Sequence, residues 1–132
     1  MSAATAPVAR LNHVTQRYRH ALALDAVSIE FPASCMVGLI GPDGVGKSTI
    51  LSIVAGARSV QEGSVTVLDG DMADAEHRAR ICSRIAYMPQ GLGKNLYPDL
   101  SIAENIEFFG RLFGHSRAER KWRIAELLGG QY

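Results

Sequence analysis

The stretch from Gly41 to Thr49 constrains the fold of this chain more than any other segment. It reads Gly-Pro-Asp-Gly-Val-Gly-Lys-Ser-Thr, which matches the phosphate-loop pattern G-x-x-x-x-G-K-S/T. Glycines let backbone N–H groups turn inward around an anion, and a helix that starts at the lysine adds its unpaired amides. Lys47 would reach the β- and γ-phosphates of a nucleotide, and the Ser48 hydroxyl would bind Mg²⁺. We therefore expect the whole loop to contact a nucleoside triphosphate: Gly41, Pro42, Asp43, Gly44, Val45, Gly46, Lys47, Ser48 and Thr49.

The residues on both sides of this loop fit the strand–loop–helix order that the pattern requires. Residues 36–40 are an uninterrupted, mostly apolar run, which predicts a strand buried on both faces. Residues 50–55 are also mostly apolar and suit a buried helix that Gly56 would end. The alternative is a glycine-rich turn that precedes Lys-Ser-Thr by chance, and both flanks argue against it.

Composition limits the partners and the location of the chain. A net charge of +1 at pH 7 gives no electrostatic argument for a direct nucleic-acid patch or for an anionic membrane surface. No apolar run approaches the ~20 residues that span a bilayer, and the N-terminus lacks the features of a signal peptide. Cys35 and Cys82 are far apart, and we expect lone buried thiols in a reducing compartment. The sequence thus predicts a cytosolic protein whose membrane association would come through a partner.

Hydrophobic patterning predicts an α/β fold around the loop. The expected strands cover residues 8–14, 26–31, 36–40, 64–68 and 84–88, and the first two are expected to pair as an antiparallel layer. Residues 74–83 are typical of a helix, and its inner face would consist of Ala75, Ala79 and Cys82. Residues 1–7 are expected to be a disordered leader.

Two further helices are expected in the C-terminal part of the chain. Each begins with a capping-box pattern, at Ser101–Glu104 and at Ser116–Glu119. Gly114 would end the first helix, and Gly129 with Gly130 would end the second. The first helix carries one apolar stripe, formed by Ile102, Ile106, Phe109 and Phe113. The inner face of the second would consist of Ala118, Trp122 and Ala125.

Two polar residues outside the loop could also contact a nucleotide. Tyr18 follows the first expected strand, and its ring could stack on a purine base. Gln90 follows the strand at 84–88, and its amide could coordinate Mg²⁺ or orient a water beside the γ-phosphate. Taken alone, each has a simpler interpretation, since a loop tyrosine is often a packing residue and a glutamine at a strand end is usually solvated.

Together with the phosphate loop, these residues resemble the nucleotide-binding domain of ABC-type ATPases. Tyr18 matches the A-loop aromatic of that family, Gly41–Thr49 its Walker A motif, and Gln90, in Tyr-Met-Pro-Gln, its Q-loop. Residues 96–114 look like the stretch after the Q-loop in drug and ABC-2 type exporters, and Gly-Pro-Asp-Gly-Val-Gly-Lys-Ser looks closest to the bacterial ribosome-associated subfamily. The resemblance implies a P-loop NTPase core with an antiparallel β layer. Residues 8–132 would form part of that domain, with the start of its helical subdomain at residues 91–132.

The resemblance also implies ATP and Mg²⁺ as ligands and two kinds of protein partner. In the family, two such domains sandwich two ATP molecules, and the helices after the Q-loop touch a membrane permease. Residues 91–114 are therefore candidates for a permease contact, which would place the protein at the inner face of the plasma membrane. The favoured function is ATP hydrolysis coupled to export; the alternatives are a soluble ATPase that works on the ribosome and an inactive, binding-only remnant.

Several motifs of a complete domain of this family are not found in the sequence. There is no Walker B strand ending in two acids, and Leu128-Gly129-Gly130-Gln131 echoes the family signature without its serine. These observations predict a truncated domain that binds MgATP and does not hydrolyse it alone, because the acidic residues that anchor Mg²⁺ and activate water are absent.

Overall fold

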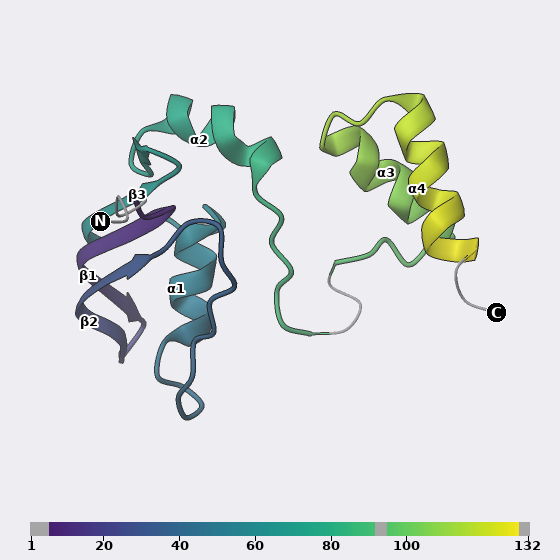
Figure 1. The fold of residues 1–132 in the computed structure, drawn as a ribbon. Coiled ribbons are helices and arrows are strands. Elements are labelled where there is room, and N and C mark those ends of the chain that lie inside the picture. The colour runs from purple at the N-terminus through teal and green to yellow at the C-terminus, as the bar shows by residue number, and fades with distance from the viewer. Residues whose placement is uncertain (1–5, 92–94, 130–132) are drawn as a thin grey trace. The chain divides into compact units, whose positions relative to one another are not determined.

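The structure is a computed structural model, and it describes residues 6–91 and 95–129 (Figure 1). It divides into two units, Met1–Tyr87 and Met88–Tyr132, which are described separately because their relative positions are not determined. Most of the leader expected at residues 1–7 lies outside the described residues. The elements in chain order are β1 (Ala9–Tyr18), β2 (Ala21–Phe31), α1 (Lys47–Val54), β3 (Glu62–Val67), β4 (Gly70–Asp71), α2 (Ala75–Ile81), η1 (Cys82–Arg84), α3 (Ile102–Leu112) and α4 (Arg117–Gly129).

The first unit is built on a four-stranded antiparallel sheet in the order β2-β1-β3-β4. The pairing of β1 with β2 confirms the expected antiparallel layer, but both strands are longer than expected. Register shifts after Leu11 put Val14, Thr15 and Gln16 at consecutive buried positions. Such bulges break the period of two by which a strand is recognised, so the polar end of β1 was expected to be a loop. Its extension places Tyr18 at the hairpin end, paired with Ala21.

One buried cluster joins the sheet to α1 and α2. It contains Leu11, Val14, Leu24, Phe31, Ile50, Ile53, Val65, Val67, Met72 and Ile81, among others. The inner face of α2 differs from the expected one: His77 and Ile81 are buried, whereas Ala75, Ala79 and Cys82 are exposed. The reason is the His77 ring, which hydrogen-bonds the Val67 carbonyl at 2.8 Å and so turns that side of the helix to the sheet. The expectation of buried thiols is wrong as well, since Cys35 and Cys82 are both exposed.

The two strands expected at residues 36–40 and 84–88 are not present. Both segments are non-helical and unpaired apart from Arg84, which ends η1. Met36 is 100% exposed and Ile40 is 98% exposed, so the run is not buried on either face. A strand exists only through hydrogen bonds to a neighbouring strand, and within the described residues no strand pairs with either segment. Apolar composition alone therefore does not make these segments part of the sheet.

Two isoleucine substitutions test whether residues 36–40 are exposed, as in the structure, or form the buried strand that the sequence predicts. Ile40→Ala should change the free energy of unfolding by less than about 0.5 kcal/mol, because the side chain is 98% exposed. Ile53→Ala, the matched control at a position that is 1% exposed, should destabilise by roughly 2–5 kcal/mol. Urea unfolding followed by circular dichroism measures both values. Equal losses would show that residue 40 is buried in solution.

The second unit consists of α3 and α4 packed against each other. Both parts of the expected capping box are present at Ser101 and Glu104, and the Ser101 hydroxyl lowers the pKa of the Glu104 carboxyl. Ser116 caps α4 by accepting a hydrogen bond from the Glu119 amide at 3.2 Å. Arg120 of α4 donates to Glu107 of α3 at 2.9 Å and links the two helices.

The expected inner face of α4 is wrong. Trp122 is 60% exposed, and Ala118 and Ala125 are also exposed. The side of α4 that faces α3 instead carries Arg120, whose side chain is 13% exposed. The ion pair with Glu107 accounts for this rotation, because burying the arginine stem directs the tryptophan to solvent.

Candidate nucleotide-binding site

Residues 36–46 contain no helix or strand, and the last three residues of the loop Gly41–Thr49 form the start of α1. Gly44 and Gly46 have φ values of 80° and 94°, in the region that L side chains rarely adopt. Gly46 is also pressed against β2: a Cβ there would collide with the Ala23 carbonyl and lie 2.6 Å from Leu24 Cδ2. The loop conformation is thus set by two glycines and by the strand behind it.

The N-terminus of α1 presents free backbone donors to the loop. Its N-cap is Gly46, so within the described residues no side chain caps the helix. The first amides of a helix lack intrahelical acceptors, and the helix dipole puts partial positive charge at that end. This end of α1 and the open space around Gly44, where a Cβ would meet no atom within 4 Å, fit a phosphate group.

Lys47 is the first residue of α1, and its side chain turns back over the loop. The ammonium Nζ donates to the carbonyl of Gly41 at 2.6 Å and to that of Pro42 at 2.5 Å. These carbonyls lie at the start of the loop, so the positive charge is held within it. A cation beside the free amides of the same loop is the donor set that a triphosphate needs.

Ser48 and Thr49 lie in the first turn of α1 and differ in exposure. Ser48 is exposed and free to reach a ligand. Thr49 is buried, and its hydroxyl accepts a long hydrogen bond of 3.4 Å from the Tyr18 phenol. A hollow of about 450 Å³ also borders Lys47 and Ser48, but its other walls are mostly apolar, including Phe31 and Leu51. Beyond Lys47 and Ser48, this lining does not offer the donors that an anion requires.

Tyr18 is brought to the phosphate loop by the extension of β1. Its hydroxyl contacts Thr49, and the guanidinium carbon of Arg58 lies 4.6 Å from the centroid of its ring. The structure therefore places the proposed base-stacking residue beside the loop. Sequence reasoning did not identify Arg58, because the contact depends on where the chain returns after α1 and no motif marks it.

Gln90 lies in a different unit from the other expected site residues. It is exposed and belongs to the second unit, so its place beside the γ-phosphate stays a prediction. Within the described residues, no group of three or more histidine, cysteine, aspartate or glutamate side chains could hold a metal ion. In the first unit, the Ser48 hydroxyl is the side chain that would bind Mg²⁺, with phosphate oxygens as its other ligands.

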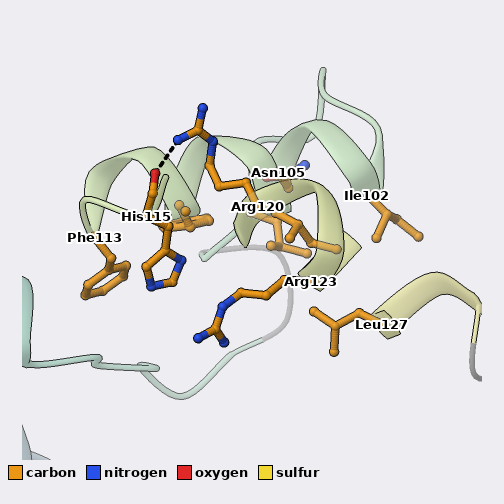
Figure 2. A pocket seen from close by; sticks show the side chains of 11 residues that line it. Ile102, Asn105, Phe113, His115, Arg120, Arg123 and Leu127 are labelled. Carbon is orange, nitrogen blue, oxygen red and sulfur yellow. Dashed lines mark hydrogen bonds between the residues drawn. The ribbon is translucent and has the colours of Figure 1, made fainter. Parts of the chain in front are cut away.

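The second unit contains a cavity of about 280 Å³ between α3 and α4 (Figure 2). The stripe expected from the sequence lines it, which confirms the face that α3 presents to α4: Ile102, Ile106, Phe109 and Phe113. Among the buried side-chain nitrogen and oxygen atoms of the described residues, His115 Nδ1 is the one that has no hydrogen-bond partner. Arg120 donates to the His115 carbonyl, the contact that Figure 2 draws as a dashed line. The lining of this cavity is mostly apolar. Part of it comes from residues 91–114, the expected permease contact, and the rest mainly from α4.

A protein-family model described as "ABC transporter" matches residues 24–131. Among curated proteins, the chain is 36% identical over 118 residues to the Fe(3+) ions import ATP-binding protein FbpC of Escherichia coli O157:H7, covering 89% of this chain and 32% of that protein. It is 31% identical over 116 residues to the Linearmycin resistance ATP-binding protein LnrL of Bacillus subtilis (strain 168), covering 88% of this chain and 36% of that protein. The chain thus spans about a third of the length of these relatives.

Solved structures give the same result for the fold. A dimeric, post-hydrolysis state of the ATP-binding cassette MJ0796 bound to ADP and Pi superposes with a TM-score of 0.73 at 26% sequence identity. That match covers 92% of this chain and 56% of the other. The structure of an ATP-binding subunit of an ABC transporter has a TM-score of 0.75 at 26% identity, with 92% and 49% covered.

Proposed function

Because this chain belongs to the ABC transporter family, in its ATP-binding domain, we propose that it binds ATP on the loop Gly41–Thr49. The observation that supports this most strongly is the first turn of α1. Its amides have no side-chain cap, and the Lys47 ammonium is held over the same loop. Backbone donors, a helix dipole and a lysine thus belong to one loop, and such groups together stabilise the charge of a β- and γ-phosphate.

Each expected site residue has a role in this proposal. Lys47 pairs with the β- and γ-phosphates, and Ser48 is a ligand of Mg²⁺, which neutralises phosphate charge when it is bound. The ring of Tyr18 stacks on the adenine base, and the Gln90 amide would be a ligand of the metal or orient a water beside the γ-phosphate. Residues 8–132 would then form part of one ATP-binding domain, with the start of its helical subdomain at residues 91–132.

Coupling to transport is the second part of the proposal. FbpC is named for import, whereas the Nod factor export ATP-binding protein I of Ralstonia nicotianae, 31% identical over 122 residues, is named for export. The direction of transport is therefore open, although the sequence favoured export. We propose that a membrane permease binds at residues 91–114 and that a second ATP-binding domain completes a dimer, as in the dimeric MJ0796 cassette. Among the residues that the structure describes, none of the helices has the length and hydrophobicity of a membrane span.

The proposal is tested by comparing nucleotides that differ only in their phosphates. Isothermal titration of the chain with ATP and with AMP, both with Mg²⁺, should give at least tenfold tighter binding of ATP, because each charge-assisted hydrogen bond contributes about 1.5–3 kcal/mol. The comparison keeps base and ribose constant, so the difference reports the phosphate loop. Equal affinities would contradict the proposed role of Gly41–Thr49.

A further inference from the structure

The ring of Tyr18 is held by two side chains that come from either end of α1. Thr49, in the first turn, accepts from the phenol, and Arg58, beyond the last turn, places its guanidinium 4.6 Å from the ring centroid. Gly56, with φ at 74°, turns the chain between α1 and Arg58. The ring is therefore fixed at its hydroxyl and on one face, next to the phosphate loop.

The charge of Arg58 is not used in an ion pair. Within the described residues, no carboxylate lies within 4.0 Å of its guanidinium, as is also true of Arg19, Arg78 and Arg84, whereas Arg10, Arg17 and Arg80 of the same unit form such pairs. Arg58 is exposed as well, so packing in the core does not account for its position. Among these residues, the guanidinium of Arg58 contacts the ring of Tyr18 through a cation–π interaction.

We infer that Arg58 is a positioning residue of the nucleotide site, which holds the ring of Tyr18 so that the base of ATP stacks on the face that the guanidinium leaves free. This inference rests on the proposed ATP site. A guanidinium over one face restricts the rotation of the ring about its side-chain bonds, and an ordered ring loses less entropy when a base binds. Arg58 acts through Tyr18 and has no assigned contact with the phosphates.

The test compares ATP with inorganic tripolyphosphate, which has the phosphates and lacks the base. Arg58→Ala should weaken ATP binding about threefold to tenfold, the range of a partly exposed cation–π contact, and should change tripolyphosphate binding by less than about twofold. In a Tyr18→Ala background, Arg58→Ala should give no further loss for ATP, since the residue acts through the ring. Arg84→Ala removes an exposed arginine from the same unit and serves as the control for net charge.

The possible outcomes separate this inference from the function on which it rests. Absence of ATP and tripolyphosphate binding to the unaltered chain would contradict the proposed function. Normal binding together with unchanged or tighter ATP binding in Arg58→Ala would overturn the role of Arg58, because the guanidinium would then be neutral or would compete with the base. Equal losses for ATP and tripolyphosphate, or a full additional loss in the Tyr18→Ala background, would also overturn it by showing a direct effect of charge.

Discussion

Lys47→Ala is expected to lower the affinity of the chain for ATP by about 100-fold, since removing one partner of a hydrogen-bonded charge pair costs roughly 2–5 kcal/mol. The ammonium is already positioned over the loop, where it donates to the carbonyls of Gly41 and Pro42. A phosphate that enters the loop can replace these neutral acceptors by charged ones, which strengthens the hydrogen bonds. Without the lysine, the charge of the β- and γ-phosphates is met by the backbone amides and by Mg²⁺, with no side-chain cation of the loop.

The specificity of this loss is as informative as its size. AMP lacks the β- and γ-phosphates, so Lys47→Ala should change AMP affinity by less than about threefold, as expected for a distant, weakly coupled charge. Lys121→Ala is the matched control, because Lys121 is exposed on α4 in the second unit and its removal changes the net charge equally. Titration calorimetry with both nucleotides measures the effect. A similar decrease for ATP and AMP would indicate that Lys47→Ala disturbs the loop in general.

The features that sequence reasoning predicted correctly are those encoded locally. The turn at Gly44 and Gly46 and the start of a helix at Lys47 follow from conformations that few residues besides glycine adopt. The capping box at Ser101 and Glu104 is equally local, since both hydrogen bonds form within one turn. The antiparallel pairing of β1 and β2 was predicted correctly, and consecutive strands along a chain are commonly neighbours in a sheet. Each of these depends on residues near one another in the chain.

The errors concern features that depend on distant partners. Residues 36–40 have the composition of a buried strand, but a strand needs a neighbour, and its own sequence does not specify one. Trp122 lies on the exposed side of α4 because the contact of Arg120 with Glu107 determines which face turns inward. Arg58 was not identified for the same reason, since its contact with Tyr18 requires both ends of α1 to be placed in space.

The second large effect is expected at Gly46, where substitution should disturb both the loop and the strand behind it. Gly46→Ala adds a side chain at a φ of 94°, which costs about 1–2 kcal/mol by itself. The new Cβ would also collide with the Ala23 carbonyl and lie 2.6 Å from Leu24 Cδ2. The carbonyl is backbone and Leu24 is 3% exposed, so neither can move without shifting β2 or the loop. We expect a total destabilisation of about 2–4 kcal/mol, in the range of severe backbone substitutions.

Gly44→Ala separates the effect of backbone strain from that of the collision. Gly44 has a comparable φ of 80°, but a Cβ there would meet no atom within 4 Å. This variant should therefore lose only the ~1–2 kcal/mol of the left-handed conformation. Gly46→Ala should in addition weaken ATP binding by at least about tenfold, because a loop moved away from β2 no longer aims its amides and Lys47 at one point. Chemical unfolding and ATP titration of both variants measure these effects, and equal destabilisation at the two positions would show that the loop does not pack against Ala23 and Leu24 in solution.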